Sequence, residues 1–165
     1  MEIAVVIVSD RSSRGERDDI TGPELIDYLK SDGISQVIYR LVPDDKEAIK
    51  KNLNELIAMK INLILTSGGT GFAKRDLTPE ATREVIEKEA PGIAEFIRIE
   101  NYKNSKNSFL SRGVCGIKNE TIILNLPGSP KGALESYKIV EKLIPHCVSL
   151  INGSISDCLA SLPEK

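Results

Sequence analysis

A glycine-rich segment of the chain could bring the backbone close to a ligand. Thr66-Ser67-Gly68-Gly69-Thr70-Gly71 follows an apolar run and places three glycines within four residues. Glycine backbones approach a ligand closely, and successive N–H groups in such a turn can surround an anion. The segment lacks the Gly-Lys-Ser/Thr of a Walker A loop and the glycine order of a dinucleotide fold. It indicates either a phosphate-binding turn or an ordinary tight turn.

Two acidic segments could hold a divalent metal ion. Asp76 lies between the glycine segment and a predicted helix start at Thr78-Pro79, and Asp44-Asp45 follows another predicted strand. Mg²⁺ prefers one or two carboxylates together with phosphate oxygens and water. These residue types also begin helices, with Thr78 as the N-cap, Asp76 facing the helix dipole, and either or both of Asp44 and Asp45 as caps. Two acidic segments facing one glycine segment favour the metal–nucleotide interpretation.

Two further polar segments complete the set of candidate site residues. Ser9-Asp10-Arg11-Ser12-Ser13 offers hydroxyl, carboxylate and guanidinium groups, and Asn125-Leu126-Pro127-Gly128-Ser129-Pro130 predicts a rigid turn between a strand and a helix. The lone histidine, His146, stands far along the chain from these segments and is expected to be structural. Carboxylate, hydroxyl, arginine and glycine chemistry suits phosphoryl or nucleotidyl transfer, in which catalysis is mainly positioning and charge stabilisation.

The elements that position these segments are predicted from periodicity. Apolar, β-branched runs indicate buried strands, and positions spaced by three or four residues indicate amphipathic helices. The predicted strands are 3–8, 37–42, 61–66, 114–117 and 121–126, and the predicted helices begin near residues 21, 46, 78, 92, 131 and 146. Thr21 is the expected N-cap of the first helix, after a long loop over 9–19. The alternation predicts an α/β fold with a mostly parallel sheet, whose loops gather at the carboxyl ends of the strands.

Length and charge limit the class of protein. The chain has 165 residues and a formal net charge of -2, which predicts one domain over 1–165 without a general affinity for nucleic acid. The start of the chain is apolar, but it lacks the features of a signal peptide or membrane span. Three cysteines without metal-ligand spacing are expected to be reduced thiols. We expect a cytoplasmic protein that binds neither membranes nor nucleic acid.

The order and spacing of these segments resemble a known family. Ser9-Asp10-Arg11, Val42-Pro43-Asp44, the glycine segment, Arg75-Asp76-Leu77-Thr78-Pro79, Leu110-Ser111-Arg112 and the Asn125–Pro130 turn occur in the order typical of the molybdopterin adenylyltransferases of molybdenum-cofactor synthesis (MogA type). MoaB proteins and the G domain of gephyrin are related. The resemblance runs from about Ile3 to Ile151. Ser67 stands where the family commonly has Thr, which keeps the hydroxyl.

The resemblance implies a fold, a reaction and an assembly. It implies a three-layer α/β/α sandwich that transfers AMP from Mg-ATP to the terminal phosphate of molybdopterin and releases pyrophosphate. It also implies a homotrimer and a partner enzyme that inserts molybdate into the product. A non-catalytic molybdopterin-binding or scaffold module, as in gephyrin, and an unrelated Mg²⁺-dependent nucleotide enzyme stay open as alternatives.

The resemblance also assigns roles to residues of this sequence. Asp44 and Asp76 would be the catalytic and metal-binding residues, with Mg²⁺ as the metal. The expected substrate- and nucleotide-binding residues are Ser9, Asp10, Ser67, Gly68, Gly69, Thr70, Gly71, Ser111, Arg112, Pro127, Gly128 and Ser129.

Overall fold

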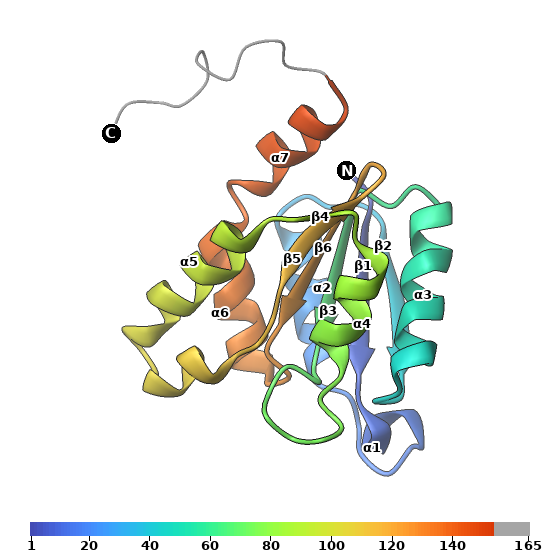
Figure 1. Ribbon diagram of the computed structural model, residues 1–165, viewed down its shortest axis with the longest axis vertical. Helices are drawn as coiled ribbons and strands as arrows, with labels where there is room; N and C mark the ends of the chain where they lie inside the picture. Colours follow the sequence, from blue (N-terminus) through green and yellow to red (C-terminus); the bar gives the residue numbers. More distant parts are fainter. Residues whose placement is uncertain (154–165) are drawn as a thin grey trace.

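The computed structural model describes residues 1–153, and this part of the chain contains a six-stranded sheet in the order β2-β1-β3-β6-β5-β4 (Figure 1). Four strands run parallel: β1 (Ile3–Val8), β2 (Val37–Val42), β3 (Leu63–Ser67) and β6 (Thr121–Leu126). β5 (Cys115–Lys118) is antiparallel to β6, and β4 (Lys88–Glu89) is antiparallel to β5. The predicted mostly parallel sheet is confirmed.

Helices cover both faces of this sheet, so the predicted three-layer α/β/α sandwich is also confirmed (Figure 1). The first face carries α2 (Thr21–Ser31), α5 (Pro91–Tyr102), α6 (Pro130–Val140) and α7 (Ile144–Ile151). The second face carries α3 (Lys46–Ala58) and α4 (Thr78–Val85). Alternate residues of β1 enter the two cores, with Val5 in the first and Val6 in the second, both fully buried. This two-sided burial explains why β1 is a continuous apolar run.

Several local predictions were wrong, because side chains that can cap a helix also bind elsewhere. Thr21 does not cap α2, and the carboxylate of Asp19 accepts from Gly22 N at 3.1 Å instead. Thr78 is the first residue of α4 rather than its N-cap. The loop predicted over 9–19 contains a short helix, α1 (Asp10–Ser13), whose N-cap Ser9 accepts from Ser12 N at 3.2 Å.

Two short elements went unpredicted, β4 and the 3₁₀ helix η1 (Lys106–Leu110). With 2 and 5 residues, they are too short to show a periodic pattern.

The sheet brings the polar segments to one edge. The parallel strands β1, β2, β3 and β6 end at this edge, which lies at the lower end of the sheet in Figure 1. β5 is antiparallel and therefore begins there, which places the preceding Ser111-Arg112 beside the loops that follow the other strands. The expectation that the candidate segments gather at one edge is confirmed.

The predictions on domain bounds, cysteines and membrane spans can be compared with residues 1–153. The predicted single domain covers 1–165, and its residues 154–165 lie outside the described residues, as does Cys158. Cys115 and Cys147 are free thiols, and burial raises the pKa of Cys115 to about 12. None of the helices within 1–153 has the length and apolar character needed to cross a membrane.

Candidate active site at the carboxyl edge of the sheet

The glycine turn after β3 has a backbone conformation that favours glycine. Gly68 and Gly69 have φ of 108° and 63°, and a side chain on Gly68 would collide with the carbonyl oxygen of Val8. Thr78 holds the turn from the start of α4: its Oγ1 donates to Gly68 O at 2.8 Å and its N–H to Gly69 O at 3.1 Å. The Thr78 hydroxyl, which was predicted to cap the helix, therefore fixes the shape of the glycine turn.

Three successive N–H groups of this turn are available to a ligand. Within 1–153, the N–H groups of Gly69, Thr70 and Gly71 have no hydrogen-bond acceptor, whereas Gly68 N donates to Leu126 O at 3.3 Å. Adjacent N–H groups in a turn with left-handed residues form a concave, anion-binding surface. Of the two interpretations of the glycine segment, this geometry favours the phosphate-binding turn.

The Pro127-Gly128 turn packs directly against the glycine turn. Ser67 Oγ donates to Pro127 O at 2.7 Å, and Thr21 Oγ1 donates to Gly128 O at 3.1 Å. A Cβ on Gly128 would lie 3.2 Å from Gly68 Cα, so the two turns could not approach as closely with a larger residue. The Ser67 hydroxyl is therefore engaged in joining the two turns.

Asp44 and Asp45 have separate roles. Asp45 is the N-cap of α3, and its carboxylate accepts from Ala48 N at 2.8 Å. Asp44 does not cap the helix, and its Oδ2 accepts from Asp10 N at 2.7 Å. Arg75 approaches both segments, since its Nε lies 2.6 Å from Asp10 Oδ2 and a terminal nitrogen donates to Asp44 O at 3.1 Å. Of the possibilities left open for this acidic pair, one residue caps and the other faces the site.

The surroundings of Asp44 disfavour the ionised form of its carboxyl group. Burial raises the pKa of the Asp44 carboxyl above its ordinary value, and the hydrogen bond from Asp10 N–H opposes this shift. The charges of Asp10 and Asp76 raise the pKa further, while Arg75 lowers it. A bound cation would relieve this accumulation of negative charge.

Asp76 lies beside Gly71 of the glycine turn, whereas Asp44 lies beside Gly69. Its Oδ2 accepts from Ala73 N at 2.8 Å, within the loop that leads to α4, and a Cβ on Gly71 would lie 2.8 Å from the same oxygen. The space beside the carboxylate is therefore open because residue 71 has no side chain. Asp76 lines a cavity of about 590 Å³.

Arg112 fixes the loop that carries Asp76. Its guanidinium donates to Gly71 O at 2.6 Å and to Asp76 O at 2.5 Å, and it forms an ion pair with Glu80 of α4. Burial acts against ionisation of Glu80, but the hydrogen bond and charge of Arg112 outweigh it and lower the pKa of that carboxyl. These contacts occupy Arg112, so in the structure it positions the loop instead of pointing into the large cavity.

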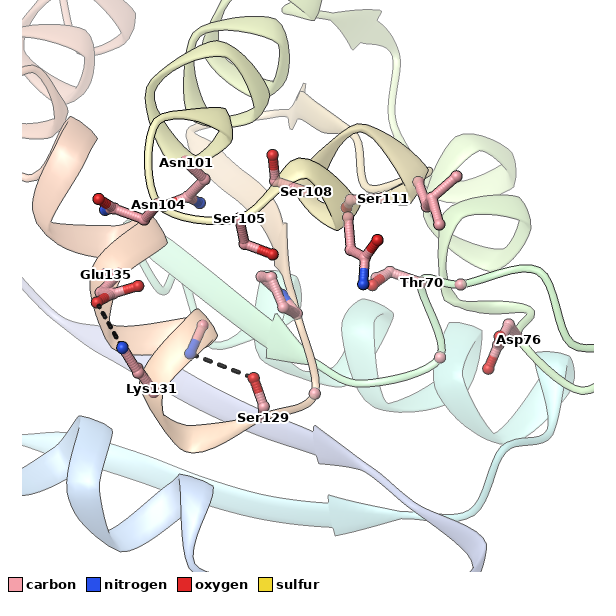
Figure 2. A pocket seen from close by; sticks show the side chains of 17 residues that line it. Thr70, Asp76, Asn101, Asn104, Ser105, Ser108, Ser111, Ser129, Lys131 and Glu135 are labelled. Atoms are coloured by element: carbon pink, nitrogen blue, oxygen red, sulfur yellow. Dashed lines mark hydrogen bonds and ion pairs between the residues drawn. The ribbon is translucent and has the colours of Figure 1, made fainter.

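Two cavities meet at the glycine turn. The larger has a volume of about 590 Å³ and the smaller about 250 Å³, and Gly69 and Gly128 line both. The larger cavity is also lined by Thr70, Gly71, Asp76, Ser111, Pro127 and Ser129 (Figure 2), and the smaller by Ser9, Asp44, Ser67 and Gly68. The edge thus brings together the predicted site residues, although Asp10 and Arg112 line neither of these two cavities. His146 lines neither as well.

Each of the two carboxylates has one oxygen atom that could bind Mg²⁺. Oδ1 of Asp44 and Oδ1 of Asp76 accept no hydrogen bond from any residue within 1–153. The described residues contain no group of three or more His, Cys, Asp or Glu side chains suited to a metal ion, so most ligands would come from elsewhere. Mg²⁺ keeps several waters and binds phosphate oxygens alongside one or two carboxylates. The donor set therefore suits Mg²⁺ that arrives with a nucleotide.

The sequence did not predict one wall of the larger cavity. This wall comes from the end of α5, the short connection to η1, η1 itself and α6. Its polar members are Asn101, Asn104, Ser105, Asn107, Ser108, Lys131 and Glu135. They carry no recognisable motif, although the density of Asn and Ser over 101–108 was a possible signal.

Comparisons with known proteins agree with this geometry. The family model described as "Probable molybdopterin binding domain" matches residues 4–146. A molybdopterin adenylyltransferase of Helicobacter pylori is 38% identical over 157 residues, which cover 93% of this chain and 89% of that protein. The molybdenum cofactor synthesis protein cinnamon of Drosophila melanogaster is 42% identical, but the match covers 92% of this chain and only 26% of cinnamon.

A solved structure supports the same assignment. The molybdopterin biosynthesis enzyme MoaB of Thermus thermophilus has a TM-score of 0.84 and 44% sequence identity, over 92% of this chain and 96% of that one. The family match extends over the strands and loops that form the carboxyl edge, the glycine turn and both carboxylates. The chain therefore belongs to the family of molybdopterin binding domains that serves molybdenum-cofactor biosynthesis.

Proposed function

We propose that this protein is a molybdopterin adenylyltransferase, which transfers AMP from ATP to the terminal phosphate of molybdopterin and releases pyrophosphate. The observation that carries the proposal is the arrangement of Asp44 and Asp76 around a glycine turn with three available N–H groups, between two cavities. One cavity for each substrate would bring their phosphates together at the turn.

The transfer of AMP is a nucleophilic substitution at phosphorus. An oxygen of the molybdopterin phosphate attacks the α-phosphorus of ATP, the bond from that phosphorus to the bridging oxygen of the β-phosphate breaks, and pyrophosphate leaves with this oxygen. The product is a phosphoanhydride between molybdopterin and AMP. Little covalent chemistry falls to the protein, so positioning and charge stabilisation account for catalysis.

The residues of this chain would divide these tasks. The N–H groups of Gly69, Thr70 and Gly71 would hold phosphate oxygens, and Asp44 and Asp76 would hold Mg²⁺. Bound Mg²⁺ would neutralise the charge that develops on the phosphates and leaving group. Because Arg112 fixes the backbone at Gly71 and Asp76, the N–H groups and the carboxylate would keep a constant relative position.

Further parts of the proposal concern assembly and location. We propose a homotrimer in the cytoplasm whose product passes to a molybdate-inserting partner enzyme. Large apolar side chains on α5 and η1 support self-association: Ile99, Tyr102, Phe109 and Leu110 are all exposed, and the rings of Tyr102 and Phe109 stack edge to face at 4.9 Å.

Pyrophosphate release from Mg-ATP, with and without molybdopterin, tests the activity. We expect release that requires molybdopterin in the wild type and falls about 10²–10³-fold in Asp76→Asn, which keeps the acceptor for Ala73 N but loses the charge. The matched control is Asp27→Asn, a change at an exposed residue of α2 that should leave the rate unchanged. Molybdopterin binding without release would instead support the scaffold module, and release that ignores molybdopterin would indicate a different acceptor.

A further inference from the structure

The Ser111-Arg112-Gly113 segment lies between η1 and β5 and contacts the glycine turn. The Arg112 N–H donates to Thr70 O at 2.9 Å, and the Arg112 guanidinium holds the carbonyl oxygens of Gly71 and Asp76. The first residue of the segment also lines the larger cavity. A shift of this segment would therefore move the N–H groups of the turn and the loop that carries Asp76.

Arg98 of α5 holds this segment from behind. Its Nη1 donates to Gly113 O at 3.0 Å, and Ser111 O accepts from the same nitrogen at the longer distance of 3.4 Å. In addition, Ser108 Oγ of η1 donates to Arg98 O at 3.1 Å. One residue of α5 thus contacts both the 3₁₀ helix and the segment that follows it.

The contact with Gly113 satisfies a carbonyl group of a buried residue. Within residues 1–153, Gly113 O accepts a hydrogen bond from Arg98 and from no other group. The backbone of Gly113 also packs against β6, because a Cβ at this position would lie 3.0 Å from Asn125 O. A buried carbonyl without a donor costs free energy, so loss of the Arg98 side chain would favour conformations in which the segment moves toward water.

The guanidinium of Arg98 has these carbonyl contacts in place of an ion pair. Arg98 is half-buried and forms no ion pair within the described residues, whereas Arg112 pairs with Glu80 and Arg83 with Glu89. The three arginines line a cavity of about 330 Å³ that contains no residue of the glycine turn. Because Arg98 lines neither cavity at that turn, it would act on the site through the segment and not by touching a substrate.

We infer that Arg98 is a positioning residue for the transfer of AMP. It holds the Ser111-Arg112-Gly113 segment, and through Arg112 it sets the position of the glycine turn and of Asp76. This inference rests on the proposed function, because it takes the turn and Asp76 to be the place of transfer. A guanidinium suits the role because its N–H groups have a fixed, planar arrangement, whereas a lysine ammonium is a flexible point charge.

Hydrogen exchange followed by mass spectrometry tests the contact without any substrate. Arg98→Met keeps the approximate length of the side chain but removes its donors. We expect peptides covering 108–114 to exchange about tenfold faster than in the wild type, and peptides from β1 and β3 to exchange at the wild-type rate. A merely structural role would accelerate exchange in all of them.

The matched control for hydrogen exchange is Arg40→Met. Arg40 of β2 is also half-buried, and its Nη1 donates to the carbonyl oxygen of Tyr39 at 3.2 Å. It lines neither cavity at the glycine turn. Exchange over 108–114 should therefore match the wild type in this variant.

Pyrophosphate release tests the effect on the reaction. Arg98→Met should release pyrophosphate about tenfold more slowly, and Arg98→Lys, which keeps one donor group, should fall between this variant and the wild type. Because Arg98 acts through Arg112, Arg98→Met/Arg112→Lys should be at most about twofold slower than Arg112→Lys alone. Arg40→Met and Asn54→Ala, the latter at an exposed position of α3, should keep the wild-type rate.

Three results would overturn the inference. They are unchanged exchange over 108–114 in a folded Arg98→Met variant, faster exchange across the whole protein, and losses of release that multiply to about a hundredfold in the double variant. If Arg98→Met does not fold, Arg98→Lys decides by the same measurements, with an expected change of about threefold in each.

Failure of the proposed function would look different. A wild-type protein that releases no pyrophosphate with molybdopterin would refute the proposed function. The exchange experiment would still decide whether Arg98 holds the segment, because it needs no turnover.

Discussion

Asp10 and Asp44 each hold the other's backbone. Asp10 N donates to Asp44 Oδ2 at 2.7 Å, and Asp44 N donates to Asp10 Oδ1 at 3.1 Å. The two residues follow the neighbouring parallel strands β1 and β2, so this reciprocal pair joins two strand ends. Because Asp10 Oδ2 is also paired with Arg75, Asp10 positions Asp44 while Oδ1 of Asp44 stays available to a ligand.

We therefore expect Asp10→Ala to lower turnover indirectly, through the position of Asp44. It leaves the part-buried Asp44 N–H without its acceptor, and we expect a loss of about 1–3 kcal/mol in unfolding free energy. Asp10→Asn keeps an acceptor for Asp44 N and should lose clearly less. Urea unfolding and pyrophosphate release measure the two effects. Equal activity of the alanine variant and the wild type would contradict a positioning role.

Arg112→Lys tests whether the shape of the guanidinium matters. Lysine keeps the charge but cannot donate at once to Gly71 O, Asp76 O and Glu80. We expect pyrophosphate release to fall about tenfold or more, because the loop that carries Asp76 would lose its fixed position. Arg83→Lys is the matched control, since the single ion pair of Arg83 within residues 1–153 is a surface contact with Glu89 at 3.5 Å. A similar rate in both variants would refute the expectation.

Asn125→Ala tests the buried hydrogen bonds beneath the turns. Nδ2 of this 4% exposed residue donates to Thr66 Oγ1 and Thr82 Oγ1, both at 2.9 Å, and its Oδ1 accepts from Val114 N at 3.2 Å. Truncation leaves several buried groups without a partner, so we expect a loss of about 3 kcal/mol in the free energy of unfolding. Asn54→Ala should change it by less than about 0.5 kcal/mol. Denaturant unfolding of both variants checks the difference.

Glu84 predicts a pH dependence of stability. Hydrogen bonds from Lys46 and Lys50 of α3 lower the pKa of this α4 carboxyl to about 2. A lowered carboxyl pKa stabilises the fold above the ordinary value of 4.5, and the contribution is lost as the pH falls toward about 2.

The matching variant is Glu84→Gln. It should melt at a lower temperature than the wild type at pH 6, and the gap should close at low pH and shrink in high salt. Glu95→Gln, on exposed α5 surface without an ion pair among the described residues, should show no such gap. A gap that stays constant between pH 6 and pH 2 would contradict the assigned cause.

The strands and main helices of this protein were predictable because burial imposes a pattern. Val37–Val42 and Thr121–Leu126 were predicted with the observed bounds. Helix α5 was predicted to begin near residue 92 and runs over Pro91–Tyr102. Caps were less predictable, because a hydroxyl such as that of Thr78 has several acceptors within reach and only the folded chain selects Gly68 O.

The sequence by itself determined the α/β class, the gathering of the polar segments at one edge and the resemblance carried by the motifs of Asp44, Asp76 and the glycine turn. These features depend on local pattern and on the geometry of parallel strands. Only the tertiary structure decided which side chains are already engaged, as Asp10 and Arg112 are, and which are left for a ligand. Only it also brought Asn101 and Glu135 together from α5 and α6 to line one cavity. Contacts between residues far apart in the chain follow from packing, which no local spacing encodes.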